Sequence, residues 1–168
     1  MLPKSNKYKP AFTMVEVLVA LAISAVLLAA IAFAFNASAV NYEDNKNISF
    51  TLNTGRQAML RMTTELRCAT AVNPATPSNQ CTFINSNGQD ITYSYQSSDK
   101  KLYLITTDGM SNISSLLCEN VNDMNFTLQT ATKDGLTYVK AVLISMTLQS
   151  DDFEHTISSA VVIRKNLE

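Results

Sequence analysis

The sequence predicts an α+β protein in which a long N-terminal helix packs on an antiparallel β-sheet. Residues 17–35 form an apolar run in which Ser24 is the only polar side chain. No proline occurs between Phe12 and Asn73, so nothing in that interval forces a helix to end. Beyond Pro77, apolar and polar residues alternate, which is the period of a strand with one buried face. These three observations place the helix first and the sheet after it.

The apolar run is long enough to cross a membrane. About 19 residues of helix span roughly 28 Å, close to the thickness of the hydrocarbon core. Lysines at positions 4, 7 and 9 precede the run, and Glu43 and Asp44 follow it. Because positively charged flanks stay in the cytoplasm, we expect the chain beyond about Asn41 to lie outside. Residues 12–40 are therefore predicted to form a single transmembrane helix.

The same helix is predicted to continue over residues 41–72 as an amphipathic, extracytoplasmic half. Gly55 is its weak point, because glycine in a helix interior costs about 1 kcal/mol relative to alanine. An apolar stripe at helical spacing is expected to cover one face of the sheet. Its members are Ile48, Leu52, Met59, Met62 and Leu66.

Residues 73–168 are predicted to form the antiparallel sheet, entered through a variable loop that contains Pro74 and Pro77. The segment 98–100 separates two alternating runs and indicates a β-hairpin. Three further runs, at 124–128, 136–148 and 153–163, are predicted to form an antiparallel meander. The apolar residues of the hairpin are Ile91, Tyr93, Tyr95, Leu102 and Leu104.

Composition argues against several classes of function. The formal net charge is -1, so there is no basic field for nucleic acid. Neither a Ser-His-Asp order nor a glycine-rich phosphate loop occurs in the sequence, so we expect no enzyme and no cofactor. A turn contains Asp151, Asp152, Glu154 and His155, but a lone histidine beside a hairpin is more typical of a solvated loop than of a metal site. We predict no metal.

The three cysteines all lie beyond the apolar run, and none has Cys-x-x-Cys spacing. A bridge between Cys68 and Cys81 would close a loop of about 14 residues and contribute about 3 kcal/mol through the unfolded state. We prefer this pairing, while a Cys81–Cys118 bridge and three free thiols stay open.

Residues 11–16 read Ala-Phe-Thr-Met-Val-Glu, so that Glu16 opens an otherwise uncharged span. The stretch from Lys9 to Ile23 resembles the leader and N-terminal helix of type IV pilins and of the pseudopilins of type II secretion. The resemblance covers about a quarter of the chain directly, and the order of helix, loop and sheet agrees with a pilin-like fold.

This resemblance implies that residues 1–11 are a leader, which a prepilin peptidase removes by cutting between Ala11 and Phe12. The new amine of Phe12 is then methylated. The implied partners are other pilins or pseudopilins in a helical filament and an inner-membrane assembly platform. The implied location is the inner membrane, with the C-terminal domain in the periplasm or outside, and then the filament.

Glu16 has a physical role within this resemblance. A carboxylate in hydrocarbon is unfavourable by roughly 2.5–3.5 kcal/mol near a helix centre, and by less near its end, unless a cation accompanies it. In a staggered array of parallel helices, the charged amine of Phe12 in one subunit can pair with Glu16 of its neighbour. The alternative is that Glu16 interacts with the dipole of its own helix, which contributes about 0.3–1 kcal/mol.

Two departures from the family pattern limit which kind of pilin subunit the resemblance implies. Ala11 stands where glycine is usual before the cut, and the segment 27–33 lacks the proline of many major pilins. The retained Glu16, in turn, argues against the tip pseudopilin that characteristically lacks it. The resemblance therefore implies a minor pilin or pseudopilin that acts in the initiation of assembly. A pilus, a secretion pseudopilus and a DNA-uptake device all stay open.

Two other readings compete with this one. Ala37-Ser38-Ala39 resembles a signal-peptidase site, and a cut there would release a soluble secreted domain that begins at Val40. The apolar run is, however, longer than the usual h-region of about 7–15 residues. The other reading is an uncleaved single-pass anchor that carries a binding domain. The mature N-terminus distinguishes all three.

Overall fold

The computed structural model describes residues 12–108, 111–133 and 135–164. One helix, α1 (Met14–Arg67), is followed by eight strands, which confirms the predicted α+β class and the pilin-like order of elements. The chain divides into two compact units, one up to Asn45 and the other from Lys46 onward. The predicted leader, including Ala11, lies outside the described residues.

The first unit contains the apolar part of α1. Every described side chain from Phe12 to Asn47 is exposed, including the whole run between Val17 and Phe35. The lone polar group of this run is satisfied within the helix, because Ser24 Oγ donates to the carbonyl of Ala20 at 2.8 Å. The Ser24 side chain therefore needs no partner outside its own helix.

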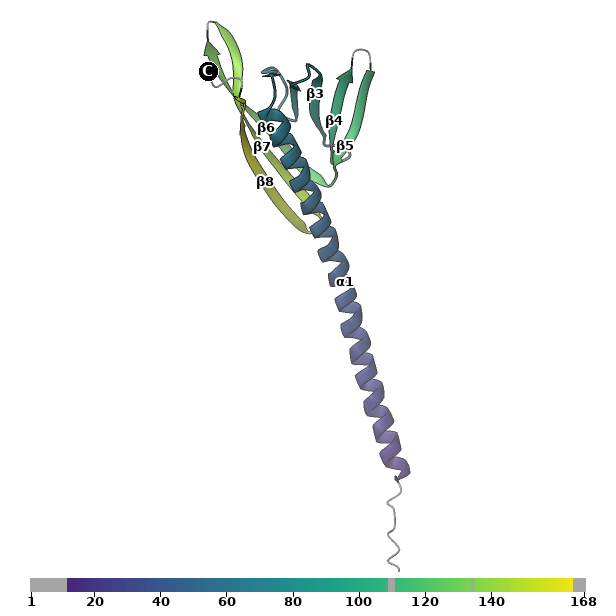
Figure 1. Ribbon diagram of the computed structural model, residues 1–168. Coiled ribbons are helices and arrows are strands. Elements are labelled where there is room, and N and C mark those ends of the chain that lie inside the picture. The colour runs from purple at the N-terminus through teal and green to yellow at the C-terminus, as the bar shows by residue number, and fades with distance from the viewer. Residues whose placement is uncertain (1–11, 109–110, 134, 165–168) are drawn as a thin grey trace, which may run out of the picture. The chain divides into compact units, whose positions relative to one another are not determined.

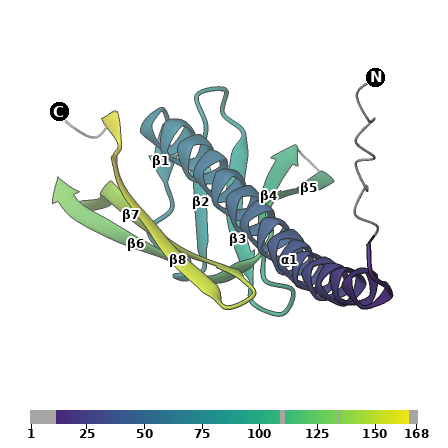
Figure 2. The same ribbon diagram turned by 90° about the horizontal axis from the view of Figure 1, so that it is seen from below.

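The second unit contains the rest of α1 and two antiparallel sheets, which diverge on either side of the helix (Figure 1, Figure 2). The five-stranded sheet runs in the order β1-β2-β3-β4-β5, and the three-stranded sheet in the order β6-β7-β8. The strands are β1 (Ala71–Val72), β2 (Gln80–Ile84), β3 (Asp90–Gln96), β4 (Lys101–Asp108), β5 (Ser111–Cys118), β6 (Val121–Lys133), β7 (Leu136–Ser150) and β8 (Phe153–Val162).

The predicted hairpin and meander are confirmed as β3–β4 and β6–β7–β8. The prediction of one sheet is wrong, because β1, β2 and β5 extend the hairpin into a sheet of its own. The predicted end of the helix at residue 72 is also wrong, since α1 ends at Arg67 and residues 71–72 are a strand.

Local hydrogen bonds explain why the helix ends early. The amides of Cys68 and Ala69 bond to carbonyls three residues back, at Glu65 and Leu66, which tightens the last turn. The amide of Thr70 then donates to the carbonyl of Ile84 at 2.8 Å and so leaves the helix for the sheet. Pairing with β2, rather than the prolines further on, therefore ends the helix.

The core of the second unit lies between α1 and the inner faces of both sheets. The predicted stripe enters it through Met59, Met62 and Leu66, which are buried, whereas Leu52 is partly buried. Gly55 is buried as well, and a Cβ added there would overlap Cδ1 of Leu148 on β7. The glycine is therefore a point where the helix passes close to a side chain of β7, rather than only a weak point of the helix.

Tyr95 joins the two sheets. Its hydroxyl, on β3, donates to the carbonyl of Asn122 at 2.7 Å and lies 3.2 Å from that of Val121, both on β6. A backbone bond from Phe126 on β6 to Ser78, 2.7 Å long, makes a second link. The Tyr95 ring is buried, so this hydrogen bond lies in the core. A buried carbonyl without a hydrogen-bond partner would lower the stability of the fold.

Candidate functional site

The N-terminal end of α1 contains Phe12 and Glu16, the residues predicted to take part in processing and assembly. Phe12 lies two residues before the helix, and Glu16 lies in its first turn. Both are exposed in the described part of the chain. The apolar residues between them, Met14 and Val15, are exposed as well.

Thr13 caps this helix, a role that the sequence analysis did not assign. The amide of Glu16 donates to Oγ1 of Thr13 at 3.3 Å, and the amide of Val17 donates to its carbonyl at 3.2 Å. Thr-x-x-Glu is the capping-box pattern, so the signal was present in the sequence. With Thr13 as cap, the Glu16 amide is satisfied at the start of the helix.

The segment that follows has the character of a membrane anchor. An 18-residue stretch of the helix Met14–Arg67 has a mean hydropathy of 2.9, and none of this stretch is buried. Ala39, the last residue of the rival cleavage motif, lies inside the same helix. The helix is thus long and apolar enough to anchor the chain in a membrane.

The structure does not bring the predicted cysteine pair together. Cys68 is exposed beside Asn85 and Ser86, whereas Cys81 is buried near the other end of β2, opposite Tyr93. Cys118 is buried at the end of β5, and all three thiols are free. The Cys68–Cys81 bridge is not confirmed and stays a prediction.

Burial raises the pKa of two of these thiols. The pKa of Cys81 rises from its ordinary value of 9.0 to about 12, because desolvation disfavours the thiolate. That of Cys118 rises from 9.0 to about 11, through burial and the nearby charge of Glu119. Both groups are thus unreactive core thiols at neutral pH rather than nucleophiles.

One polar cluster joins α1 to β3. The Tyr93 hydroxyl donates to Oε2 of Glu65 at 2.6 Å, and Nε of Arg61 pairs with Oε1 of the same carboxylate at 2.8 Å. Burial, followed by the hydrogen bond and charge of Glu65, raises the pKa of Tyr93 above its ordinary value of 10.0. The protonated phenol therefore serves as a fixed donor that orients the helix on the sheet.

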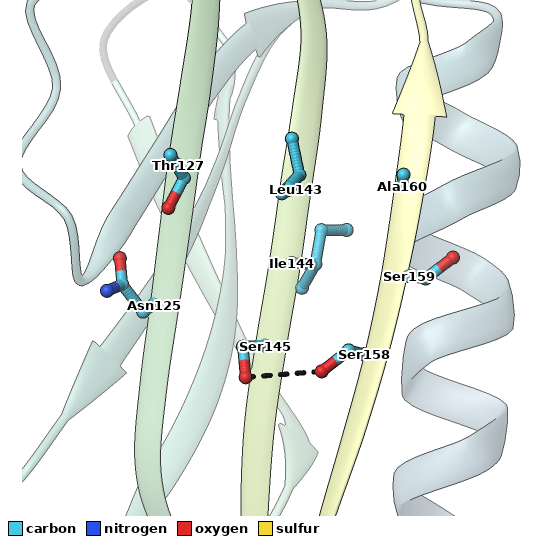
Figure 3. A pocket seen from close by; sticks show the side chains of 8 residues that line it. All are labelled: Asn125, Thr127, Leu143, Ile144, Ser145, Ser158, Ser159 and Ala160. Atoms are coloured by element: carbon cyan, nitrogen blue, oxygen red, sulfur yellow. Dashed lines mark hydrogen bonds between the residues drawn. The ribbon is translucent and has the colours of Figure 1, made fainter.

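A depression on the outer face of β6–β7–β8 has no titratable group in its lining. It holds about 360 Å³ and is open to solvent, and polar and aliphatic side chains from all three strands line it (Figure 3). Ser158 and Ser145 hydrogen-bond across two of these strands at 3.4 Å. The lining residues are Asn125, Thr127, Leu143, Ile144, Ser145, Ser158, Ser159 and Ala160.

The acidic turn near His155 has no metal-site geometry. Glu154 accepts a hydrogen bond from Nδ2 of Asn122 at 3.0 Å, and the His155 ring stacks on Phe153 with centroids 6.1 Å apart. Within 12–108, 111–133 and 135–164, no group of three or more potential metal-ligating side chains gathers.

Comparison with protein-family models matches residues 6–32 to the prokaryotic N-terminal methylation motif. No curated protein matches the chain. The matched residues include both sides of the Ala11–Phe12 bond, the Thr13 cap and Glu16, so the motif coincides with the capped start of α1. The chain thus carries the prepilin signature of type IV pilins and pseudopilins.

Proposed function

We propose that this chain is a minor pilin or pseudopilin, a structural subunit that prepilin peptidase processes and that enters a type IV pilus or a type II secretion pseudopilus. The observation that carries the proposal is the methylation motif at residues 6–32, which overlaps the apolar first part of α1, where every described side chain from Phe12 to Asn47 is exposed. In this proposal residues 1–11 are the leader and residues 12–40 first cross the inner membrane. The domain beyond the helix faces the periplasm.

The exposed apolar surface explains why such a chain assembles. Large apolar side chains around the whole circumference of a helix require either lipid or other apolar helices as neighbours. When the subunit leaves the membrane, a bundle of similar helices takes the place of lipid. Packing between helices then supplies adhesion that is not directional.

In this proposal Glu16 sets how neighbouring subunits align along the filament. Cutting between Ala11 and Phe12 creates an α-amine, which stays cationic after methylation. In a staggered array, the amine of one subunit pairs with Glu16 of its neighbour and so fixes the register between them. Thr13 supports the pairing, because its hydroxyl accepts from the Glu16 amide and so fixes the first turn of the helix that carries the Glu16 carboxylate.

Mass spectrometry of the mature N-terminus tests this function. The chain is expressed in cells with an active prepilin peptidase, with a peptidase-deficient strain as the matched control. We expect N-methyl-Phe12 in the first strain and an uncleaved leader in the second. A mature chain that begins at Val40, or an intact leader in both strains, would overturn the proposal.

The initiating role has a separate test. Deletion of the gene is expected to lower the number of filaments per cell more than their length, because a subunit that starts assembly acts once in each filament. Complementation with the wild-type chain should restore the count. An unchanged number of filaments would remove the initiating role without affecting the processing result.

A further inference from the structure

The turn between β2 and β3 contains the one Asn-Gly pair of the sequence, Asn87-Gly88, and both residues are exposed. In such a pair the main-chain nitrogen of the glycine can attack the side-chain amide carbon of the asparagine, because glycine has no side chain that hinders the approach. Every other asparagine of the chain is followed by a residue with a side chain. Asn87 is thus the asparagine at which this reaction meets the least hindrance.

The Asn87 side chain is free to turn towards Gly88. Its main-chain amide donates a hydrogen bond, but its side-chain amide has no hydrogen-bond partner in the described part of the chain. Gly88 has a φ of 81°, and a Cβ added there would meet nothing within 4 Å. The space around the attacking nitrogen is therefore open.

Asn85 holds this turn closed. Its Oδ1 accepts hydrogen bonds from the amides of Asn87 and Gln89, each at 2.9 Å, and its Nδ2 donates to Oε1 of Gln89 at 3.2 Å. Its main-chain amide donates to the carbonyl of Gln89 at 3.0 Å, and its carbonyl accepts from the amide of Gly88 at 3.1 Å. We call these five hydrogen bonds the Asn85 clamp. One side chain of the kind that stabilises turns thus fixes the whole loop.

The clamp also engages the nitrogen that would attack. The proton of the Gly88 amide must leave before this nitrogen can bond to carbon, and in the closed turn that proton is directed at the carbonyl of Asn85. The bond between the Asn87 amide and Oδ1 of Asn85 restrains the main chain next to it. Attack therefore requires a local opening of the turn, an event that costs less than global unfolding.

We propose that Asn87 is a modification site, where the side-chain amide is converted to aspartate and isoaspartate at a rate set by opening of the Asn85 clamp. The Gly88 nitrogen loses its proton to a solvent base and bonds to Cγ of Asn87. The bond between Cγ and Nδ2 breaks, and Nδ2 leaves as ammonia after taking up a proton, so that a succinimide ring forms.

Water then opens the ring at either of its two carbonyls. Cleavage of the bond from the Gly88 nitrogen to Cγ gives aspartate, whereas cleavage of the bond to the main-chain carbonyl carbon of residue 87 gives isoaspartate. Both steps consume water alone and need neither an oxidant nor an enzyme. Each product carries a carboxylate in place of a neutral amide, and isoaspartate also lengthens the main chain of the turn by one carbon.

The test incubates the full-length chain, purified in detergent, at neutral pH and follows every asparagine by peptide mass spectrometry. Asn112 is the internal control, because it is exposed on β5 but is followed by Ile113. We expect Asn87 to convert at least about tenfold faster than Asn112, since a β-branched residue crowds the attacking nitrogen at the control position. Equal rates at the two asparagines would overturn the proposal.

Two further readouts identify the chemistry. In heavy-oxygen water the product at residue 87 should gain the heavy isotope, because hydrolysis opens the ring. Isoaspartyl methyltransferase should label the incubated chain and should not label an Asn87→Gln variant. A product without heavy oxygen, or equal labelling of the variant, would contradict the succinimide route.

Substitutions at Asn85 test the clamp. Asn85→Ala removes Oδ1 and Nδ2 and should raise the rate at Asn87 by about tenfold, the factor expected when a closed turn loses the net contribution of such hydrogen bonds. Asn85→Asp keeps an acceptor at Oδ1 and should stay close to the wild-type rate. Asn73→Ala is the matched control, because it removes a comparable bond, from the amide of Ala75 to Oδ1 of Asn73 at 3.0 Å, in a different loop.

Thermal unfolding of each variant in detergent checks the fold. If Asn85→Ala does not fold, the wild type in urea supplies the rate of the open turn, which should exceed the rate of the folded chain by at least about tenfold. Equal rates in the folded and unfolded wild type, or no acceleration in a folded Asn85→Ala variant, would show that the clamp does not control the reaction.

Discussion

A charged side chain such as that of Glu16 is energetically unfavourable in hydrocarbon. The Glu16 amide already donates to Oγ1 of Thr13. Glu16→Gln keeps the shape of the side chain and the capping bond but removes the charge. We expect membrane insertion to be unchanged and incorporation into sheared filaments to fall by about tenfold, since a hydrogen bond between charged groups contributes about 1.5–3 kcal/mol. Immunoblots of membrane and filament fractions measure both quantities.

Ser24→Ala is the control for this substitution, because it removes a polar group from the same helix without removing a charge. The Ser24 hydroxyl bonds only within the helix, to Ala20, so incorporation should stay at the wild-type level. If Glu16→Gln also left incorporation unchanged, the amine pairing would be wrong and the dipole interaction of Glu16 would be favoured.

The buried acidic groups predict how stability depends on pH. The pKa of Cys81 in the fold is about 12 and that of Cys118 about 11, against an ordinary 9.0 for both. A raised pKa means that the folded chain holds the proton more tightly than the unfolded chain does. The stabilisation is therefore complete below pH 9 and is lost as pH rises from 9 towards 12.

Urea unfolding in detergent between neutral pH and about pH 10.5 measures this decline. Cys81→Ala removes one titrating group, so the midpoint should fall less steeply above pH 9 in this variant. Equal slopes in the two proteins would show that Cys81 is not a free buried thiol. Alkylation of the unfolded chain without reductant then shows whether it is bridged to Cys68.

The residues of the processing motif were readable from sequence because their relations are local. Phe12 and Glu16 are only four positions apart, and the uncharged run follows directly. The cysteines show the limit of such reading. A short sequence separation between Cys68 and Cys81 suggested a bridge, but the register of β1 on β2 sets them toward different ends of the strand.

At the level of elements, the close approach of Gly55 to Leu148 predicts the effect of a single methyl group. Gly55→Ala would gain about 1 kcal/mol of helix propensity. The added Cβ overlaps a side chain that is itself buried, and such overpacking typically costs about 1–3 kcal/mol. We expect net destabilisation of up to about 2 kcal/mol, measured by urea unfolding.

Two further variants distinguish the effect of helix propensity from the effect of overpacking against Leu148. Asn53→Ala, on the exposed side of the same helix, reports propensity alone and should be neutral or slightly stabilising. In a Leu148→Val background the obstructing Cδ1 atom is absent, so adding Gly55→Ala should cost little or should stabilise. An equal cost of Gly55→Ala in both backgrounds would refute the packing explanation.

The strands that the sequence predicted are those with one buried face. In β4 the buried Leu102 and Leu104 alternate with half-buried residues, and in β3 the apolar Ile91, Tyr93 and Tyr95 are buried although Ser94 between them is buried as well. Turn residues separate the two runs. The strand β5 escaped prediction because it is an edge strand, exposed on both faces for most of its length, and has no alternation to detect. The two-residue β1 depends on pairing with distant Ile84, which no local pattern reveals.

At the level of the whole second unit, the two sheets should unfold together. Tyr95→Phe removes the hydroxyl that bonds to the carbonyls of Val121 and Asn122, and leaves these acceptors without it in a largely buried place. We expect a loss of about 1–3 kcal/mol in one cooperative transition, observed by circular dichroism and by tyrosine fluorescence.

Tyr103→Phe is the matched control, because its hydroxyl bonds to the exposed carboxylate of Asp99 at 2.7 Å. Its effect should stay below about 0.5 kcal/mol, as for most surface changes. If Tyr95→Phe produced two separate transitions, the sheets would be independent and the link to β6 would be their main connection.

The division into two sheets could not be predicted from the sequence, for the same reason that the exposure of Phe50 and Leu60 on α1 could not. Both depend on which side of each element the rest of the chain covers, and that is decided by contacts between distant residues such as Tyr95 and Asn122. The apolar spacing of Met59, Met62 and Leu66 predicted a buried side of α1. It gave no sign that Phe50 and Leu60 would remain uncovered on the other.

The contact between Gly55 and Leu148 also limits how this chain can diverge over evolutionary time. A larger residue at position 55 is acceptable only once position 148 has become smaller, so the second change must accompany or precede the first. Descendants of this sequence should therefore vary at the two positions as a pair. We therefore expect selection to retain a glycine that lowers the intrinsic propensity of its helix, because a side chain ninety-three positions further along the chain occupies the space that a Cβ would need.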